Sequence, residues 1–302
     1  MLSFARGPQT KYTLLVQEQT AHELIMGFTL RLDGDGNISR PTLALPAQAT
    51  HKYGRGHAMV MSGPKLRTGA SRLVAQAALA VGAGLVTIFG DKDVLSAQAA
   101  HVTAIMLQEH NGNFDFIDDR VRALAVGPGA GVSLRLADDV LALLATKLPI
   151  VLDADALTCF AGQPAMLFAS LHHQAVLTPH EGEFLRLFPD LLFADRPSAA
   201  RAAAVRVGSV VLLKGPKTIV AAPDGRLALN GHASPWLATA GSGDVLTGIV
   251  CGLLAQCQDA FEAAAISAWL HGDIGVRYGP GLTADKMADL IPEVLKGCFS
   301  DT

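Results

Sequence analysis

The sequence has few features of exported, membrane-bound or nucleic-acid-binding proteins. Only four of its 302 residues are cysteines, and they are widely spaced without a CxxC pair, which excludes a disulfide framework and a CxxC zinc or redox motif. The 24 basic and 27 acidic residues give a net charge of -3 without a long run of one sign, so no basic patch is indicated. The N-terminus lacks the basic stretch, apolar core and cleavage site of a signal peptide. We therefore expect a cytoplasmic protein without nucleic-acid or membrane partners.

Several common catalytic motifs are also missing. The sequence has no GxxxxGK[ST] loop, and no GxGxxG opens a helix after a strand with an acidic residue about twenty positions later. A P-loop enzyme and a Rossmann dinucleotide site are therefore unsupported. His180 and Glu183 have metal-ligand spacing, but no second histidine completes HExxH, which argues against a zinc protease.

The longest uncharged apolar stretch is too short to span a membrane. Residues 73–89 are 17 residues without a charge and include Gln76, Gly82 and Gly84, whereas a spanning helix needs ~20 apolar residues. Its alanine-rich first part favours a helix and its last part, residues 85–89, a buried strand. Because 50% of the residues are hydrophobic and 17% charged, the chain is expected to be globular.

From residue 50 onward, short apolar runs alternate with longer alanine- and leucine-rich segments. This alternation predicts an α/β fold of repeated βα units around a largely parallel sheet. The predicted strands are residues 58–61, 85–89, 123–126, 150–152, 175–177, 210–213, 218–221 and 227–229, the last two paired through a turn at 223–225. The predicted helices are residues 70–81, 134–146, 181–188, 198–207, 244–256, 261–278 and 283–296.

The first 48 residues break this rhythm. A hairpin-like segment at 30–32 precedes a turn at 34–37, and residues 40–48 look like a linker. We therefore treat residues 1–48 as a leader of unknown role, a remnant or a linker, and residues 49–302 as the main domain. Nearly every predicted strand ends in a loop with glycine, proline or aspartate, and ligands of open α/β sheets bind at the carboxyl ends of strands. These loops are the candidates for a binding site.

The strongest local signal is the run ATAGSGD at residues 238–244, which precedes an apolar helix. Its two glycines let backbone N–H groups face a ligand, and a helix N-terminus adds unpaired donors and a positive dipole end. A phosphate could sit against residues 241–243, and Asp244 beside it could deprotonate a hydroxyl. The alternative is that Asp244 only caps the helix.

Two further loops carry glycines or carboxylates. The run GPGAG at residues 127–131 would let a substrate approach the backbone, although glycine and proline also mark ordinary strand ends. Asp153 and Asp155 follow a buried strand and suit metal-bound water or a substrate hydroxyl. Either aspartate could instead cap the next turn, an interpretation that fits Asp155 better.

Two later loops carry histidine, glutamate and lysine. The run TPHEGE at residues 178–183 suits a substrate-contacting loop at the start of a helix. Residues 214–218 hold two lysines and free N–H groups, which could meet the phosphate or base of a nucleotide or form a solvated turn. The other histidines, including His172, His173 and His271, have no spacing that distinguishes them from surface or core residues.

Taken in order, these segments resemble the ribokinase-like family of ADP/ATP-dependent NAD(P)H-hydrate dehydratases, which repair hydrated nicotinamide cofactors. The resemblance covers about residues 50–295. It rests on HKYGRGH at 51–57, TGA at 68–70, GAGLVT at 82–87, GPG at 127–129, LDADAL at 152–157, LTPHEGE at 177–183, LKG at 213–215 and GSGD at 241–244. It implies a three-layer α-β-α fold with a mostly parallel central sheet, and it makes residues 49–302 the dehydratase catalytic domain.

The resemblance implies nucleotide-dependent dehydration of the S-epimer of hydrated NADH or NADPH (NADHX or NADPHX), through a phosphorylated intermediate. By position, Asp244 matches the family's base, and the anion hole is matched by Gly241, Ser242 and Gly243. The positions that contact substrate are matched by Ala70, Gly129, His180 and Asp244. The nucleotide positions are matched by Lys214, Gly215, Pro216, Lys217, Thr218 and Gly243. Lesser candidates near the reacting centre or its metal are Asn230, Asp153 and Glu183.

The resemblance also implies cofactors and partners. Bacterial members, which these motifs resemble, generally use ADP, so ADP is the expected phosphate donor and ATP the alternative. Mg²⁺ is expected because transferring phosphate oxygens need neutralisation, although no ligand cluster is visible in the sequence. A homo-oligomer is expected. The NAD(P)H-hydrate epimerase that many bacterial relatives carry is expected on a separate chain, because the first 50 residues are too few to hold it.

One segment of the sequence departs from the family's pattern. In place of the family's usual glycine-rich turn after the first strand, this sequence has SGPKLR at residues 62–67, whose proline and positive charges could alter substrate entry.

The nearest rival function is a ribokinase-like kinase of a vitamin alcohol, which would use the same anion hole and aspartate. A nucleotide-binding regulator without turnover would need a broken Asp244 or glycine loop, and neither is broken.

Overall fold

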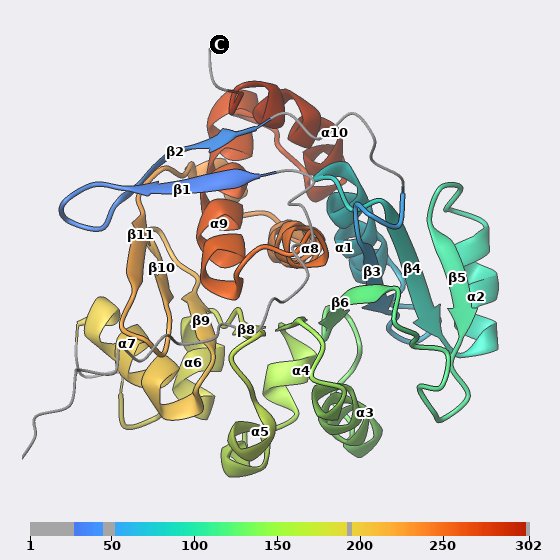
Figure 1. The fold of residues 1–302 in the computed structure, drawn as a ribbon. Coiled ribbons are helices and arrows are strands. Elements are labelled where there is room, and N and C mark those ends of the chain that lie inside the picture. The colour runs from blue at the N-terminus through green and yellow to red at the C-terminus, as the bar shows by residue number, and fades with distance from the viewer. Residues whose placement is uncertain (1–26, 45–51, 192–194, 300–302) are drawn as a thin grey trace, which may run out of the picture.

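A nine-stranded sheet forms the middle layer of the computed structural model, which describes residues 27–44, 52–191 and 195–299 (Figure 1). Its strand order is β11-β10-β9-β8-β7-β6-β3-β4-β5, and every neighbouring pair is parallel except the two that involve β10. The strands are β3 (His57–Met61), β4 (Leu85–Gly90), β5 (Met106–Glu109), β6 (Val121–Val126), β7 (Ile150–Leu152), β8 (Ala175–Leu177), β9 (Val210–Leu213), β10 (Thr218–Ala221) and β11 (Leu227–Asn230). This architecture confirms the predicted α/β fold with a mostly parallel sheet.

Helices cover both faces of the sheet, which makes three layers (Figure 1). The helices are α1 (Gly69–Ala80), α2 (Lys92–Ala99), α3 (Leu134–Ala145), α4 (Asp155–Thr158), α5 (Pro164–Ser170), α6 (Glu181–Leu187), α7 (Arg196–Val207), the short 3₁₀ helix η1 (Pro235–Leu237), α8 (Ser242–Ala255), α9 (Ala260–Tyr278) and α10 (Ala284–Lys296). Side chains alternate along the strands, so Ala58 and Val60 join the core that includes α1, α8, α9 and α10, whereas Met59 and Met61 join the core that includes α3, α4, α6 and α7.

The strand order reverses between β3 and β6. The chain adds β4 and β5 on one side of β3 and then returns to place β6 on the other side. The loops that leave β3 and β6 therefore diverge at a topological switch point, where open α/β sheets bind their ligands. These loops touch so closely that a Cβ on Gly63 would lie 1.9 Å from the carbonyl oxygen of Gly129. Glycine at position 63 thus allows the two loops to meet.

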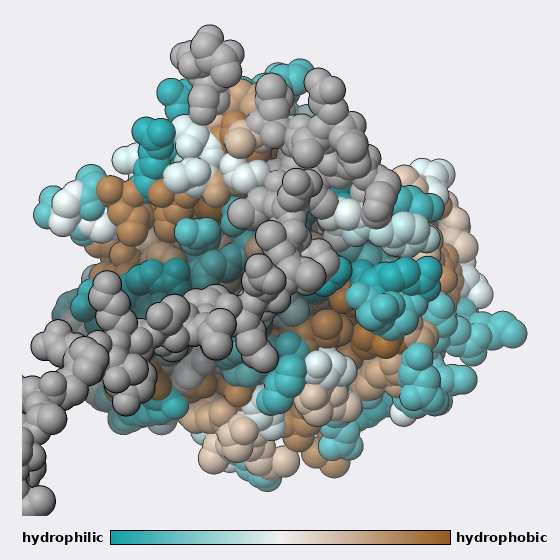
Figure 2. Space-filling model, in the orientation of Figure 1, coloured by the Kyte–Doolittle hydropathy of each residue, from teal (hydrophilic) through white to brown (hydrophobic). Residues whose placement is uncertain are grey.

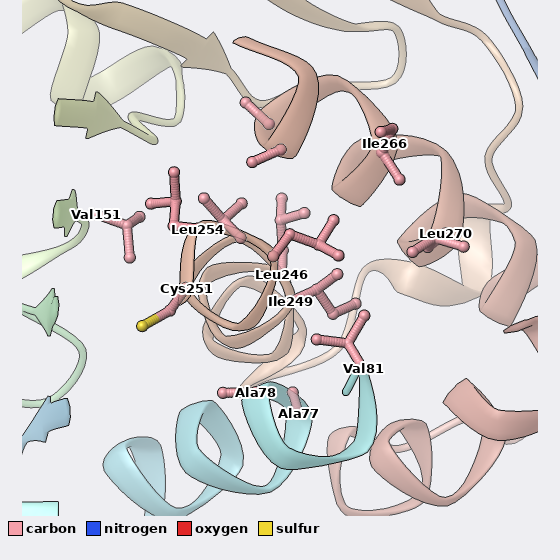
Figure 3. Packing of buried hydrophobic residues seen from close by; sticks show 14 of the residues in the cluster. Ala77, Ala78, Val81, Val151, Leu246, Ile249, Cys251, Leu254, Ile266 and Leu270 are labelled. Carbon is pink, nitrogen blue, oxygen red and sulfur yellow. The ribbon is translucent and has the colours of Figure 1, made fainter. Parts of the chain in front are cut away.

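Helix α8 is held on several sides by apolar residues. Figure 3 shows it surrounded by Ala77 and Ala78 of α1, Val81 directly after α1, Val151 of β7, and Ile266 and Leu270 of α9. Gly248 and Gly252 of α8 face α1, and a Cβ on Gly248 would lie 2.3 Å from the carbonyl oxygen of Val74. This close packing fixes the position of the first turn of α8, which carries the GSGD motif.

We expect Gly248→Ala to lower the free energy of unfolding by ~1–3 kcal/mol, the usual effect of overpacking a tight interface. The added methyl group would overlap the backbone of α1, which cannot move aside as a flexible side chain could. Urea denaturation measures the change. Gly162→Ala is the matched control, because nothing lies within 4 Å of its Cβ position, and it should change stability by less than ~0.5 kcal/mol. Equal stability of the two variants would contradict the packing argument.

The predicted strands and helices all exist, but the sequence prediction missed several elements and expected a linker where a strand forms. The sequence prediction missed β5, α2, α4 and α5, of which β5 is exposed or half-buried along its length and has no apolar run. Two strands, β1 (Phe28–Leu32) and β2 (Ile38–Leu43), form an antiparallel hairpin. Residues 40–43, expected in a linker, thus belong to a strand. Residues 45–48 of that expected linker, the first 26 residues and His51 of the first family motif lie outside the described residues.

The hairpin lies beside the main sheet rather than apart from it. Phe28, Ile38 and Leu43 are buried in the same core as α9 and α10, and Leu43 is only 1% exposed. On the face seen in Figure 2, hydrophilic and hydrophobic residues are interspersed. Among the described residues, every helix is too short or too polar to cross a lipid bilayer.

Candidate active site

A cavity of about 670 Å³ opens where β9 and β11 meet the first turn of α8. It falls in the size range of small-molecule sites. Of the predicted nucleotide residues, its lining includes Lys214, Gly215, Pro216, Thr218 and Gly243, and it also includes His180, Asn230, Ser242 and His271. Lys217 is in the same turn but not in the lining. The structure therefore brings the predicted nucleotide loop and the GSGD helix to one cavity.

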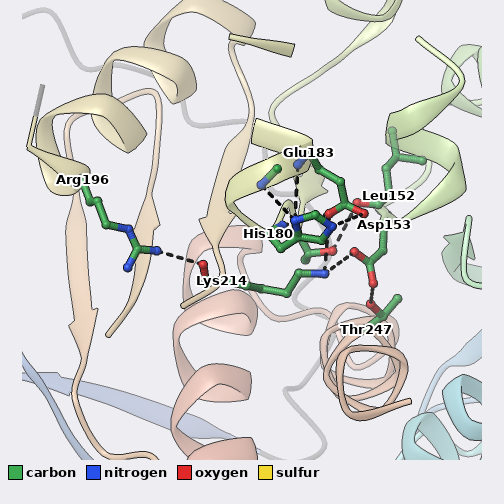
Figure 4. A network of polar contacts seen from close by, with 9 residues as sticks. Leu152, Asp153, His180, Glu183, Arg196, Lys214 and Thr247 are labelled. Carbon is green, nitrogen blue, oxygen red and sulfur yellow. Dashed lines mark hydrogen bonds and ion pairs between the residues drawn. The ribbon is translucent and has the colours of Figure 1, made fainter. Parts of the chain in front are cut away.

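Lys214 lies between two carboxylates at the centre of the site (Figure 4). Its Nζ donates to Asp153 Oδ1 at 2.7 Å and lies 3.9 Å from Glu183 Oε2, while Thr247 Oγ1 donates to Asp153 Oδ2 at 2.8 Å. Burial alone would lower the pKa of Lys214, but the two carboxylates outweigh burial and raise it. The ammonium therefore stays charged. A Cβ on Gly243 would lie 3.6 Å from this Nζ, so the charge reaches the start of α8.

Asp244 stands in the first turn of α8 without serving as its cap. The cap position belongs to Gly241, whose φ of +85° suits glycine, and α8 has no side-chain cap hydrogen bond. The capping alternative is therefore wrong. Burial, together with the nearby charge of Asp153, raises the pKa of Asp244 to about 6, although Lys214 opposes the shift. A carboxylate with this pKa is suited to act as a base near neutral pH.

The N-terminus of α8 offers unpaired backbone donors, but not all of those predicted. Within the described part of the chain, the amides of Gly243 and Asp244 have no hydrogen-bond partner. The amide of Ser242 instead donates to the carbonyl oxygen of Thr239 at 3.2 Å. Of the predicted cradle of residues 241–243, Ser242 can therefore offer a ligand its side chain but not its amide. Positive helix-dipole charge and free amides make this end an anion site.

His180 and Glu183 cap α6 reciprocally. His180 Nδ1 accepts from the amides of Gly182 and Glu183, and Glu183 Oε2 accepts from the amide of His180 at 2.8 Å. Because Nδ1 is an acceptor, the proton of the neutral ring resides on Nε2. Neither residue forms a metal cluster, since no group of three His, Cys, Asp or Glu side chains in the described ranges could hold an ion. The exposed ring of His180 still lines the cavity.

Asp155 anchors the glycine loop after β6. Its Oδ2 accepts from the amide of Gly131 at 2.8 Å, and the chain before α4 has no side-chain cap. The prediction that Asp155 caps the next turn is therefore wrong. In the same region, a Cβ on Gly129 would lie 3.0 Å from Ala70 Cβ, so the two predicted substrate positions are neighbours at the switch point. Neither of them lines the cavity beside Lys214.

Asn230 is at the end of β11 and has a structural role. Its Nδ2 donates to the carbonyl oxygens of His232 and Ala268, and its Oδ1 accepts from the amide of His232. The side chain is 2% exposed, so these bonds join β11 to α9 at the cavity wall. It is close to the site, as expected, but its polar groups already have partners.

Three residues at the site were missed by sequence reasoning. His271 of α9 places Nε2 2.9 Å from Ser242 Oγ, and burial lowers the pKa of His271 to about 4. Thr247 donates to Asp153, and Arg196 of α7 donates to the carbonyl oxygen of Lys214 (Figure 4). Arg196 also donates to the carbonyl oxygen of Lys217. A Cβ on Gly215 would lie 2.4 Å from Arg196, so the turn and the guanidinium are tightly packed. These contacts join distant segments, and no local motif announces them.

The raised pKa of Asp244 predicts the acid side of a pH–rate profile. Turnover that needs the ionised carboxylate should fall as the pH drops through about 6, with the uptake of one proton. The charge of Asp155 contributes to the raised pKa, so Asp155→Asn should shift this fall to lower pH while the new side chain still accepts from Gly131. Steady-state rates across the pH range measure both curves. A profile that stays flat from neutral pH down to pH ~5, as for an aspartate with its ordinary pKa, would contradict the raised pKa of Asp244.

Comparisons with known proteins identify the family of this chain. The family model described as NAD(P)H-hydrate dehydratase matches residues 58–293. The bifunctional NAD(P)H-hydrate repair enzyme Nnr of Synechocystis is 38% identical over 275 residues, which are 84% of this chain and 50% of that protein. Its counterpart in Mycobacterium tuberculosis is 38% identical over 222 residues, 73% of this chain and 45% of that protein. The chain thus spans about half the length of the curated relatives it matches.

Solved structures share the fold. The ADP/ATP-dependent NAD(P)H-hydrate dehydratase of Bacillus subtilis, co-crystallised with ATP and Mg²⁺, is 26% identical with a TM-score of 0.73, over 85% of this chain and 95% of that one. A ribokinase-like protein of Enterococcus faecalis has the same TM-score at 22% identity, over 85% of this chain and 92% of that one, and shows the fold alone. The family resemblance inferred from the motifs is confirmed. The chain belongs to the NAD(P)H-hydrate dehydratase family.

Proposed function

We propose that the chain dehydrates the S-epimer of NADHX and NADPHX to NADH and NADPH at the expense of ADP or ATP. The observation that carries this proposal is Asp244, a carboxylate with its pKa raised to about 6, beside free helix amides and the Lys214 ammonium. A base next to an anion site is what phosphoryl transfer to a hydroxyl requires. The family membership and the Nnr relatives supply the substrate class.

In this mechanism, Asp244 accepts the proton of the ring hydroxyl as its oxygen attacks the terminal phosphorus of the nucleotide. The P–O bond to the nucleotide breaks, and the amides of Gly243 and Asp244, with Lys214 nearby, stabilise the charge on the transferred group. Phosphate then leaves the ring together with a proton from the neighbouring carbon, which restores the double bond. Phosphate leaves more readily than hydroxide, and this difference is why a nucleotide is consumed.

The nucleotide would occupy the cavity that is lined by Lys214, Gly215, Pro216 and Thr218. The Bacillus subtilis structure with ATP and Mg²⁺ supports a nucleotide at this kind of site, and ADP remains the donor that we expect. The carboxylates of Asp153 and Glu183 already have hydrogen-bond partners within the protein. They would therefore bind magnesium only when the ion enters together with the phosphates of the nucleotide. Bound there, magnesium would neutralise charge on the phosphate oxygens.

The substrate would bind at the switch point, beside Ala70, Gly129 and His180. Ala70 in the first turn of α1 and Gly129 in the loop after β6 are neighbours, and the exposed ring of His180, whose Nε2 lies 3.4 Å from Glu183 Oε1, lines the cavity. We propose a homo-oligomer, with an NAD(P)H-hydrate epimerase as its functional partner. The relatives named above are bifunctional, and this chain matches half of their length.

Product analysis separates this function from a small-molecule kinase. Hydroxyethylthiazole kinase of Pyrococcus horikoshii shares the fold with a TM-score of 0.53 but only 15% identity, over 81% of this chain and 92% of that one, which shows the fold alone. Phosphorus NMR of a reaction with hydrated NADH and ADP or ATP should show one inorganic phosphate for each reduced cofactor. A stable phosphate ester that accumulates on a vitamin alcohol, without inorganic phosphate from hydrated NADH, would establish the kinase instead.

A further inference from the structure

The hydroxyl of Ser242, the first residue of α8, lies at the cavity and has no role in the mechanism described above. The amide of Ser242 is used by Thr239, and its side chain is 5% exposed at the edge of the cavity. Among the described residues, the hydroxyl has one partner, His271 Nε2 at 2.9 Å. His271 comes from the middle of α9, and it lines the same cavity.

The direction of this hydrogen bond decides what Ser242 can do. If the hydroxyl donates to Nε2, its hydrogen is used and its lone pairs would face a phosphate, which repels them. If Nε2–H donates to Oγ, the hydroxyl hydrogen is free to donate to a phosphate oxygen. An anion at the free amides of Gly243 and Asp244 favours the second arrangement, because a charged acceptor strengthens the bond. Burial keeps His271 neutral by lowering its pKa, so either arrangement has a single ring proton.

We propose that His271 is a positioning residue that donates Nε2–H to Ser242 and thereby turns the serine hydroxyl toward the transferred phosphoryl group. Ser242 then adds a side-chain donor to the two backbone donors of the helix end. This inference rests on the proposed function of the site, and it adds how the site holds the phosphoryl group that is transferred. The amide of Ser242 cannot donate to a ligand because it already donates to Thr239, and in this arrangement the serine side chain takes its place as donor.

A double-mutant cycle on nucleotide binding tests the proposal. Calorimetry with MgATP and with MgADP would be run on the full chain and on Ser242→Ala, His271→Leu and the double variant. Loss of a hydrogen bond to a charged group should weaken binding roughly 10- to 100-fold in each single variant. Because His271 acts through Ser242, the double variant should bind no more weakly than Ser242→Ala alone. Additive losses would overturn the proposal.

Rescue distinguishes positioning from a merely structural role. The terminal amide of His271→Gln places an N–H donor near the position of Nε2, so this variant should bind within a few-fold of the unchanged chain, whereas His271→Leu should not. His173→Leu, an exposed histidine ahead of β8, is the control for loss of an imidazole and should bind normally. Equal losses in His271→Gln and His271→Leu would overturn the proposal. If His271→Leu fails to fold, the comparison of His271→Gln with Ser242→Ala remains.

The readout also keeps this proposal separate from the proposed function. MgATP binding reports on the cradle whether or not hydrated NADH is a substrate. Non-additive losses in the cycle without dehydration would support the role of the Ser242–His271 pair and contradict the dehydratase function. Dehydration of hydrated NADH with additive losses in the cycle would support the dehydratase function and contradict the role of the pair.

Discussion

Asp244→Asn should lower turnover of hydrated NADH by roughly 100- to 10,000-fold, the range that a general base contributes. Asparagine keeps the size of the side chain but cannot accept the hydroxyl proton. The neighbouring amides of Gly243 and of residue 244 remain, so calorimetric binding of MgATP should change little. Near-normal turnover would contradict the role of Asp244, and loss of nucleotide binding would mean that the carboxylate holds the cradle in shape.

The same variant should be more stable than the unchanged chain at neutral pH. The pKa of Asp244 is raised from 3.8 to about 6 in the fold, so between these values the folded state binds more protons than the unfolded state. Stability conferred by the protonated form is therefore lost as the pH rises through about 6. The advantage of Asp244→Asn should shrink toward pH 4, and urea denaturation at both pH values measures it. An advantage that does not depend on pH would contradict the raised pKa.

Lys214→Met should lower the free energy of unfolding by ~3–5 kcal/mol, because it leaves a buried carboxylate without its partner. Asp153 is 1% exposed, and after the change the Thr247 hydroxyl would be the one hydrogen-bond donor left to its carboxylate within the described part of the chain. Turnover should also fall, by roughly 100- to 1,000-fold, because a charge aimed at the developing anion is removed. Denaturation curves and steady-state rates measure the two effects.

The double variant Asp153→Asn with Lys214→Met separates stability from function. Removing both charges should recover most of the stability lost in Lys214→Met, since replacing a buried ion pair by neutral groups is often close to neutral. Turnover should stay low, because the ammonium beside Gly243 is still missing. Recovery of turnover along with stability would show that Lys214 matters only for folding.

The local patterns of the sequence were sufficient to predict most of the sheet. Strands β7, β8 and β9 begin and end where the apolar runs do, because a strand buried on both faces needs a continuous run. The edge strand β5 escaped prediction for the opposite reason, since its residues are partly exposed and polar. The hairpin β1–β2 was only half recognised, because its burial depends on α9, more than two hundred residues later.

The site was predicted where a single loop carries the chemistry and missed where it does not. Asp244 and Gly243 stand in one motif, so their neighbourhood is visible in the sequence. The pairing of His271 with Ser242 joins two helices, and the pairing of Lys214 with Asp153 joins two strands 61 residues apart. The loss of the Ser242 amide depends on the left-handed turn at Gly241, which a residue pattern does not specify.

The most direct measurement is recovery of the near-ultraviolet absorbance of reduced nicotinamide when the purified chain is mixed with hydrated NADH, magnesium and a nucleotide. Parallel reactions with ADP, ATP or no nucleotide, and with Asp244→Asn, complete the experiment. We predict recovery that needs a nucleotide, proceeds with ADP and is nearly abolished in Asp244→Asn. Absence of recovery with either nucleotide, from folded chain that binds MgATP, would contradict the dehydratase function.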